Sequence, residues 1–336
     1  MTEVWTASVN RPGFGLADGI EAERAGFDGV SFGDTQHLSA DPYCGLAVVA
    51  RATERLRLMV GVTNPGTRHP AVTAAAIATV QVESGGRAVL GLGRGDSALA
   101  YIGLPPVSVK EFVDYTDRVQ GYLRGEVVET GGFPSEIPWI AASGLPKVPV
   151  DVAATGPKMI GYGACFAERL TVNMGAEPER VAWALEVARA AREAAGVTTP
   201  LALGAYLVVA AHDDRATARD LARACLGVYA RFSGLPGGTA ELLTPEDKLV
   251  VDAVTADYDR NYGRGWGRHV NHLDEDFVDR FGVVGTPAEC LARLKELVAL
   301  GLDHLVLVEG RDANRPEGWG ESHAALAAEV LPGLRS

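Results

Sequence analysis

An alternation of apolar runs and helical segments along the chain is the feature that most limits its possible folds. Strands that are apolar nearly throughout are typical of a parallel sheet covered on both faces. Eight such units predict a single (β/α)8 TIM barrel over residues 1–336, with an open doubly wound sheet as the alternative. The predicted strands are Val4–Val9, Phe27–Phe32, Leu56–Val62, Arg87–Leu92, Pro149–Ala153, Leu170–Asn173, Leu201–Ala210 and Asp303–Val308.

Two stretches interrupt this alternation. Residues 125–147 include EVVETGGFPSEIPWI, in which glycine and proline indicate a short hairpin or an extended insertion. Residues 233–283 show weak periodicity and contain several glycines. In a barrel, these two insertions are expected to form substrate-facing walls, so the identity of the substrate depends on them.

Charge and cysteine content exclude several classes of partner. The net charge of -12 argues against general affinity for nucleic acids or for anionic membranes. Four cysteines lie far apart without a CxxC or Cys/His cluster, which favours free thiols in a reducing compartment and predicts no metal site. No signal peptide and no apolar run of membrane-spanning length is found. A cytoplasmic location is therefore expected.

In a barrel, chemistry belongs at the carboxyl ends of the strands. The second predicted strand is followed by GDTQH, in which Asp34 is suited to orient a polar heterocycle and His37 to exchange a proton near neutral pH. The simpler interpretation is a loop in which Asp34 holds backbone amides. A lone histidine is weak evidence for catalysis, so the catalytic residue stays unassigned.

The third predicted strand ends in VGVTNPGTRHP, residues 60–70. Gly61 removes side-chain bulk and permits unusual backbone geometry, so this end suits a flat ligand lying against the backbone. A tight turn at Asn64-Pro65-Gly66 explains the same residues without any ligand. His69-Pro70 predicts the start of the next helix.

Two further junctions are suited to anions. After the fourth strand, glycine amides and a guanidinium in GRGDS, residues 93–97, predict a phosphate contact, although the pattern is not a GxGxxG fingerprint. The alternative is a flexible loop in which Ser97 caps the next helix. After the fifth strand, TGPKM, residues 155–159, opens a helix with proline and adds a lysine, which predicts a second phosphate contact or an ordinary helix start. A basic loop at residues 260–269 predicts either a lid over an anionic ligand or a solvated insertion.

Taken together, GFDGVSFGD, LRLMVGVTNPGTRHP, AVLGLGRGDSALAYIG and AATGPKMIGYGA resemble the luciferase-like oxidoreductases. The chain is most similar to the deazaflavin-dependent branch, which includes methylenetetrahydromethanopterin reductase, over most of residues 1–195. This resemblance implies a (β/α)8 barrel that binds coenzyme F420 or FMN at the carboxyl-terminal mouth. It also implies a cis peptide bond between Gly61 and Val62 that supports the ring.

The resemblance further assigns the cofactor site residue by residue. It places Asp34 at the polar edge of the ring, with Thr63 and Asn64 against ring or ribityl groups. Thr35 stands where several relatives have a catalytic histidine, and the first-strand glutamate of the methylene-pterin reductases has no clear match within Val4–Val9. The implied cofactor residues are Asp34, Gly61, Val62, Thr63, Asn64, Gly93, Arg94, Gly95, Asp96, Ser97, Thr155, Gly156, Pro157, Lys158 and Met159.

These features predict an F420-dependent oxidoreductase that transfers a hydride between the deazaflavin and a small organic substrate. One alternative is an FMN-dependent monooxygenase of the same fold, and another is a barrel that binds a flavin-like molecule without turnover. The family often dimerises, so a homodimer is the assembly to test, although no interface is evident from the sequence.

Overall fold

The computed structural model describes residues 2–11, 13, 15–234, 239–260, 269–309 and 317–336. Most of the basic loop, residues 261–268, lies outside the described residues. Internal contacts divide the chain into two compact units. The N-terminal unit comprises Ala7–Arg24 and Asp28–Ala153, and the C-terminal unit comprises Met1–Thr6, Ala25–Phe27 and Ala154–Ser336. The expectation of a single domain stays a prediction, and each unit is described by itself.

The main sheet closes on itself, as predicted for a (β/α)8 barrel. Its strand order is β10-β9-β11-β1-β2-β3-β4-β7-β8, and an additional β9–β8 pairing returns the order to its beginning. This closure rules out the open doubly wound sheet. The eight barrel strands are β1 (Glu3–Ser8), β2 (Gly29–Phe32), β3 (Arg57–Thr63), β4 (Ala88–Leu92), β7 (Val150–Ala154), β8 (Arg169–Val172), β9 (Ala202–Ala211) and β11 (His304–Glu309).

Within the N-terminal unit, β2, β3, β4 and β7 are paired in parallel. The helices start at the residues that their capping chemistry predicts. Asp41 accepts hydrogen bonds from two amides of α2, His69 caps α3 ahead of a proline, and Ser108 forms a capping box with Glu111 in α5. The helices of this unit are α1 (Gly15–Ala25, whose last residue is assigned to the other unit), α2 (Pro42–Ala52), α3 (Pro70–Ser84), α4 (Ser97–Ala100), α5 (Val109–Leu123) and α6 (Pro138–Ala142).

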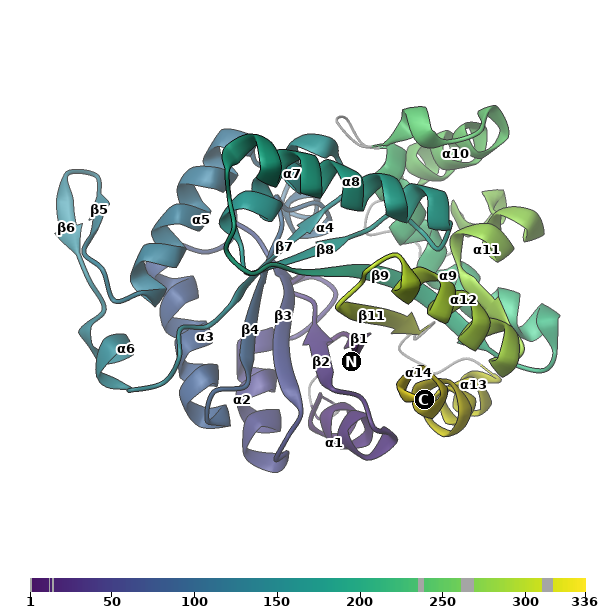
Figure 1. Ribbon diagram of the computed structural model, residues 1–336, viewed down its shortest axis with the longest axis horizontal. Coiled ribbons are helices and arrows are strands. Elements are labelled where there is room, and N and C mark those ends of the chain that lie inside the picture. The colour runs from purple at the N-terminus through teal and green to yellow at the C-terminus, as the bar shows by residue number, and fades with distance from the viewer. Residues whose placement is uncertain (1, 12, 14, 235–238, 261–268, 310–316) are drawn as a thin grey trace. The chain divides into compact units, whose positions relative to one another are not determined.

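The first interruption is the predicted hairpin. Strands β5 (Val128–Thr130) and β6 (Phe133–Ser135) pair in antiparallel register. Together with α6, they project from the remainder of their unit beyond α5 (Figure 1). Phe133 and Trp139 on this projection are 69% and 42% exposed, so the hairpin buries little apolar surface of its own.

Within the C-terminal unit, β9 pairs in parallel with β8, β11 and the short extra strand β10 (Val283–Gly285). Gly204 of β9 lies level with Thr171 of β8 and His304 of β11. A Cβ atom at Gly204 would lie 2.1 Å from His304 Nε2, so only glycine lets this imidazole cross β9 to reach the Thr171 hydroxyl at 2.8 Å. The unit's flanking helices are α7 (Pro157–Phe166), α8 (Pro178–Ala195), α12 (Pro287–Ala299), α13 (Trp319–Ala325), a π-helix (Leu326–Val330) and α14 (Leu331–Arg335).

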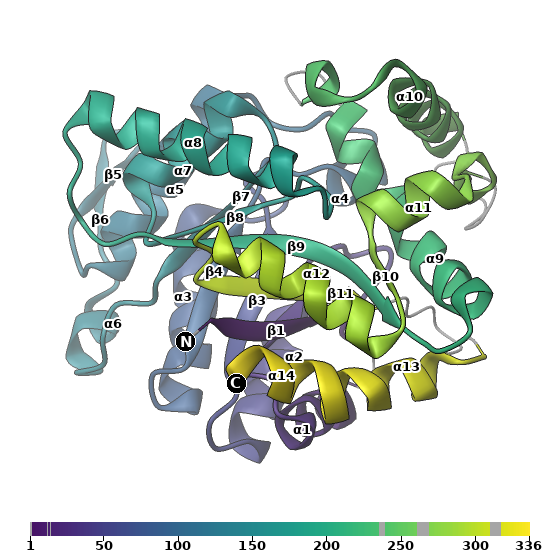
Figure 2. The ribbon, with the colours of Figure 1, turned by 45° about the vertical axis from the view of Figure 1, so that its right-hand side comes forward.

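The second interruption is largely helical in its described part. It contains α10 (Pro245–Arg260) and α11 (Glu275–Phe281), with 3-10 turns at Ala240–Leu242 and His269–His272. Helix α9 (Arg215–Gly234) precedes these helices and is grouped with them. The helix that leads to the next barrel strand, β11, is α12, which follows β10. Helices α9, α10 and α11 gather beyond the carboxyl end of β9 (Figure 2).

A charged contact fastens α11 to α10. Arg280 donates to both oxygens of Asp247, at 2.9 Å and 2.5 Å, and also to Glu177 at 3.0 Å. Burial alone would raise the pKa of Asp247, but the hydrogen bonds from Arg280 and Thr244, together with the charges of Arg280 and Arg180, outweigh this effect, so the pKa is lowered. The ionised carboxylate therefore stabilises the folded state.

Asp247 is expected to make the stability of this region acid-sensitive. A carboxyl whose pKa is lowered by folding contributes stability above its ordinary pKa and loses it as the pH falls through the lowered value. The Asp247→Asn variant should lose about 2 kcal/mol of unfolding free energy at pH 7. Its melting temperature should approach that of the wild type in acid, measured by circular dichroism. An equal difference at both pH values would contradict the assignment.

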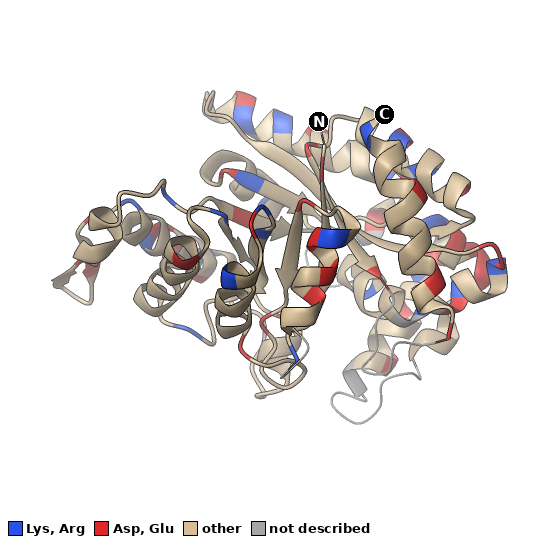
Figure 3. Ribbon diagram, turned by 90° about the horizontal axis from the view of Figure 1, so that it is seen from below, with Lys and Arg blue, Asp and Glu red and all other residues tan. Residues whose placement is uncertain are grey.

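Charged side chains are interspersed over the helices, with lysine and arginine often close to aspartate and glutamate (Figure 3). In the part of the chain that the structure describes, no cluster of three or more His, Cys, Asp or Glu residues could hold a metal ion. Among the same residues, no helix combines the length and apolar character needed to cross a membrane.

Candidate functional site

Backbone near the carboxyl end of β3 is accessible, although the middle of the strand is buried. Leu58, Met59 and Val60 are 0% exposed, whereas Gly61 and Val62 are partly exposed. The peptide bond between Gly61 and Val62 is cis, as the resemblance predicts. A short stretch of backbone with one small side chain is thus available to a ligand at the carboxyl end of this strand.

Two glycines on β4 and after it make room for this strand end. A Cβ atom at Gly91 would lie 2.4 Å from the Val60 carbonyl oxygen, and one at Gly93 would lie 2.9 Å from Val62 Cγ2. The Gly93 amide donates to the Thr63 carbonyl at 2.9 Å. The glycine-rich sequence after the fourth strand therefore serves first to let the two strand ends approach each other closely.

A chain of polar contacts lies beside this strand end. The Thr63 hydroxyl donates to Asp34 Oδ2 at 2.7 Å, and Arg68 Nε donates to the same oxygen at 2.9 Å. Arg68 Nη2 donates to Asp41 Oδ2 at 2.7 Å. Asp34 and Thr63 are 6% and 0% exposed, so this end of the series of hydrogen bonds lies in the protein interior. It connects the loops after β2 and β3 with the first turn of α2.

The electrostatic environment favours the charged forms of Arg68 and Asp41. Burial would lower the pKa of Arg68, but the hydrogen bonds to Asp34 and Asp41 outweigh it and raise the pKa. Burial would likewise raise the pKa of Asp41, but the hydrogen bonds from Arg68 and from the Cys44 and Tyr43 amides, together with the charge of Arg68, outweigh it, so that pKa is lowered. The pKa of Tyr43, whose ring lies 4.7 Å below the guanidinium, is raised by burial and by the negative charge of Asp34. The phenol therefore stays protonated.

The loops after β2, β3 and β4 pack against one another. Gln36 donates to the Ala98 carbonyl at 2.7 Å, and the His37 ring stacks on Tyr101 with 5.1 Å between centroids. His37 is exposed, and its stacking on Tyr101 gives it a structural role where the loops after β2 and β4 meet. Leu99 lies where a Cβ atom of Gly66 or Gly95 would be, at 2.5 Å and 2.6 Å.

The geometry distinguishes between the alternative interpretations that the sequence motifs allowed. Asn64 Oδ1 accepts from the Gly66 amide at 3.0 Å, so the predicted tight turn is present. Asp34 accepts from the side chains of Thr63 and Arg68 rather than holding backbone amides. Asp96, and not Ser97, is the N-cap residue of α4, and its side chain makes no capping hydrogen bond. The side chain of Arg94 donates to the Val107 carbonyl at 2.7 Å and thereby ties its own loop.

The remaining predicted residues belong to the C-terminal unit, at the start of α7. Gly156 is the N-cap residue and Pro157 follows it, and no side chain caps this helix start. Pro157 and Lys158 are exposed, whereas Met159 is buried. Uncapped amides beside an exposed lysine are the features expected of a phosphate contact. The structure brings Asp34 together with Thr63, and Gly93 with Val62, in the other unit.

A small cavity lies where β8 and β9 end in the C-terminal unit. Its volume is about 10 Å³, roughly the space of one water molecule. Arg180 stacks on the Phe281 ring at 4.5 Å and donates to Ser233 at 2.7 Å and Thr239 at 3.3 Å. Burial lowers the pKa of Arg180 to about 10, against the opposing charges of Glu177 and Asp247. The cavity is lined by Asn173, Gly175, Tyr206, Val208, Leu226, Tyr229, Ala230 and Phe281.

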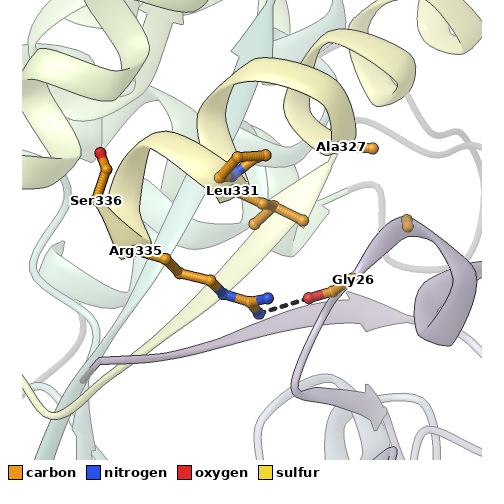
Figure 4. A pocket seen from close by; sticks show the side chains of 7 residues that line it. Gly26, Ala327, Leu331, Arg335 and Ser336 are labelled. Atoms are coloured by element: carbon orange, nitrogen blue, oxygen red, sulfur yellow. Dashed lines mark hydrogen bonds between the residues drawn. The ribbon is translucent and has the colours of Figure 1, made fainter.

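A larger hollow of about 440 Å³ in the same unit lies away from the carboxyl ends of the strands (Figure 4). It lies between Gly26 and the last helix, where Arg335 Nη2 donates to the Gly26 carbonyl at 2.5 Å. Gly26 precedes a strand instead of following one, so this hollow is not formed by the loops in which barrel chemistry is found.

Sequence analysis alone did not identify Arg68 or Arg180. Arg68 stands inside the motif TNPGTRHP, but an arginine after a turn is read most simply as an exposed charge. Its partners Asp34 and Asp41 lie 34 and 27 residues away, so no local pattern marks the pairing. Arg180 lies in the first turn of α8, and nothing in the sequence marks it as buried.

A closed parallel barrel with polar loops after its strands is the architecture of (β/α)8-barrel enzymes. A model of the family described as luciferase-like monooxygenase matches residues 19–304. The chain therefore belongs to the luciferase-like family, as its motifs indicate.

Individual relatives within this family are similar along nearly their full length. The 5,10-methylenetetrahydromethanopterin reductase of Methanolobus tindarius is 30% identical over 295 residues, which cover 85% of this chain and 86% of the relative. The solved coenzyme F420-dependent tetrahydromethanopterin reductase of Methanopyrus kandleri has a TM-score of 0.78 at 21% identity and 99% coverage of both chains. An F420-dependent secondary alcohol dehydrogenase, solved with an F420–acetone adduct, also has a TM-score of 0.78, at 17% identity, covering 100% of this chain and 99% of that one.

Proposed function

We propose that this protein is a coenzyme F420-dependent oxidoreductase that transfers a hydride between the deazaflavin and a small organic substrate at the barrel's carboxyl-terminal mouth. The observation that carries the proposal is the accessible Gly61–Val62 step at the end of β3, flanked by the bonded pair Thr63 and Asp34. The methylenetetrahydromethanopterin reductase and the F420-dependent structures in the same family support this choice of cofactor.

Within each unit, the residues present suit one part of a cofactor that has a flat ring and a phosphate-bearing tail. Gly61 and Val62 offer a surface without bulk, and the carboxylate of Asp34 stands beside it to accept hydrogen bonds from a heterocycle. The uncapped start of α7, with Lys158, suits the phosphate. The deazaflavin supplies the hydride chemistry when bound, and the protein's part is to bind the ring, orient it and exclude water.

The remaining proposed contacts follow from the same resemblance. Asn64 is placed beside the ring or the ribityl chain, and Gly93, Arg94, Gly95, Asp96 and Ser97 toward the ribityl-phosphate side. Thr155, Gly156, Pro157 and Met159 join Lys158 at the phosphate. The four cysteines are free thiols, which agrees with the proposed cytoplasmic location.

Titration of the purified protein with F420 and with FMN, followed by fluorescence quenching, tests the function. We expect F420 to bind at micromolar concentration and the Lys158→Ala variant to bind it roughly tenfold more weakly, since one charge-assisted contact is lost. Arg94→Ala is expected to have a smaller effect, because its side chain also holds Val107. Arg124→Ala, on an exposed residue paired with Glu126, is the control.

Two outcomes would contradict these assignments separately. Failure of both cofactors to bind below millimolar concentration would exclude the cofactor-dependent function. Unchanged F420 affinity in the Lys158→Ala variant would exclude the phosphate assignment alone. Tight binding of FMN with oxygen consumption, and no binding of F420, would identify an FMN-dependent monooxygenase instead.

A homodimer is proposed from the surface of α3. Residues 70–82 of this helix contain no charged side chain, yet Val72 and Val82 are 54% and 45% exposed. On the adjacent α2, Val48 is 52% exposed. Exposed valines on a helical stretch without charge form an apolar surface typical of an interface, so a second copy of this chain is the expected cover.

The Val72→Glu variant is expected to dissociate the dimer, as measured by light scattering after gel filtration. A charge in an apolar interface loses its hydration without gaining a partner. Leu249→Glu, at a residue that is 72% exposed on α10, is the matched control and should remain dimeric. A monomeric wild-type protein would exclude the homodimer.

A further inference from the structure

The Asp34 carboxylate is buried and needs a countercharge. It is 6% exposed, and burying an ionised carboxylate without a partner is strongly unfavourable. The guanidinium of Arg68 provides the charge through Nε at 2.9 Å, with Nη2 at 3.4 Å from the second oxygen. Thr63 occupies another site on Oδ2 at 2.7 Å. The direction in which Asp34 presents its carboxylate is therefore set by Arg68 and Thr63 together.

Arg68 is itself fixed from three sides. Its Nη2 bonds Asp41 at 2.7 Å, and Asp41 in turn accepts from the amides of Tyr43 and Cys44 at the start of α2. The guanidinium also lies over the Tyr43 ring, with 4.7 Å to the centroid. The start of a helix thus anchors the guanidinium, and the guanidinium anchors a carboxylate beside the proposed ring surface.

This geometry requires a planar fork. Nε serves one carboxylate and Nη2 reaches a second, while the flat face stacks on an aromatic ring. A lysine ammonium is a single charged point without a planar face, so it can neutralise Asp34 but cannot hold both carboxylates in this arrangement. A requirement for arginine at this position would therefore show that the side chain positions the two carboxylates and does not only balance their charge.

We propose that Arg68 is a positioning residue of the cofactor site: it holds Asp34, and through Asp34 the Thr63 side chain, in the orientation that binds the flat ring. The role rests on the proposed function and assigns to Arg68 a task that it performs through Asp34. Misplacing a binding group by about 1 Å can cost roughly 100-fold. Loosening Arg68 is therefore expected to weaken cofactor binding by displacing Asp34.

Three variants test this role in the full-length protein with F420 as the probe. Arg68→Met is expected to weaken F420 binding roughly 10- to 100-fold, and Arg68→Lys by an intermediate factor, because charge alone restores part of the interaction. In Arg68→Ala, added methylguanidinium is expected to restore binding in part. Arg51→Met removes an arginine that is 75% exposed on α2 and should bind F420 as the wild type does.

A double-mutant cycle with Asp34→Asn shows whether Arg68 acts through Asp34. The two effects on F420 affinity are expected to be strongly non-additive, and methylguanidinium is expected not to rescue Asp34→Asn. Circular dichroism identifies any variant that fails to fold, and in that case Arg68→Lys carries the comparison.

The results separate this role from the proposed function. A wild-type protein that does not bind F420 would overturn the function and, with it, the role. Wild-type binding together with unchanged affinity in Arg68→Met would overturn the role alone. Additive effects in the cycle, or equal loss in Arg68→Lys and Arg68→Met without rescue by methylguanidinium, would also overturn it.

Discussion

Replacing Arg87 with methionine is expected to lower the unfolding free energy by roughly 3 kcal/mol while leaving cofactor affinity unchanged. Arg87 stands just before β4, at the amino end of the strand. Its guanidinium donates to the carbonyls of Leu56 at 2.6 Å and Ala50 at 2.7 Å, and to both the hydroxyl and the carbonyl of Thr53. Its Nε bonds the Ser84 carbonyl at 2.8 Å.

These acceptors include carbonyls at or near the carboxyl ends of α2 and α3, which have no partner within their own helices. Burial lowers the pKa of Arg87, with the charge of Glu23 opposing it, so the side chain is partly withdrawn from water. Methionine keeps the apolar stem and removes every donor. The unfolding free energy should be measured by urea titration and F420 affinity by fluorescence quenching.

Arg124→Met provides the matched control. Arg124 is 47% exposed and binds Glu126 on the surface, where a salt bridge contributes little. We expect its stability to stay within about 0.5 kcal/mol of the wild type. A comparable loss in both variants would show that charge, and not capping, accounts for the effect of Arg87.

The barrel could be predicted from the sequence because each strand is an apolar run with a clear end. All eight predicted strands are present, and the hairpin within residues 125–147 is confirmed. Proline also marked one helix start correctly, at Pro70 of α3. These signals are local, so a single sequence is sufficient to identify them.

The insertion after β9 could not be predicted to the same degree. Its helices α10 and α11 bury a few apolar side chains, such as Val254 and Phe277, and are also held by charged contacts, among them Arg280–Asp247 and Arg219–Asp279. Hydrophobic periodicity is therefore weak, although the segments are helical. The pairing of an arginine with an acid on another helix depends on tertiary structure and leaves no local pattern.

The candidate site was predictable in its backbone and not in its supporting side chains. The small residue at Gly61 and the turn at Asn64 follow from the motif, whereas the close approach of β3 at Gly91 and Gly93 is seen only in the structure. Arg68 was missed, since its partners Asp34 and Asp41 lie 34 and 27 residues away. Contacts at such separations emerge only when the loops are placed in space.

Replacing Gly91 with alanine is expected to weaken F420 binding by at least roughly 100-fold. The added Cβ atom would lie 2.4 Å from the Val60 carbonyl oxygen, which is backbone and cannot rotate away. The pairing of Val60 with Leu90 fixes the two strands at this level, so relief requires the end of β3 to move. That movement carries Gly61 and Val62, the surface proposed for the ring, and Thr63 with its bond to Asp34.

Two further glycine variants show whether position, and not glycine itself, decides the effect. Gly93→Ala would place a methyl group 2.9 Å from Val62 Cγ2, a side-chain atom that can shift, so a weaker loss of about tenfold is expected. Gly320→Ala on α13 meets nothing within 4 Å and should bind F420 normally, with slightly higher stability from improved helix propensity. If the Gly91→Ala protein folds and binds F420 with wild-type affinity, the end of β3 is not part of the cofactor site, because its displacement would then not affect binding.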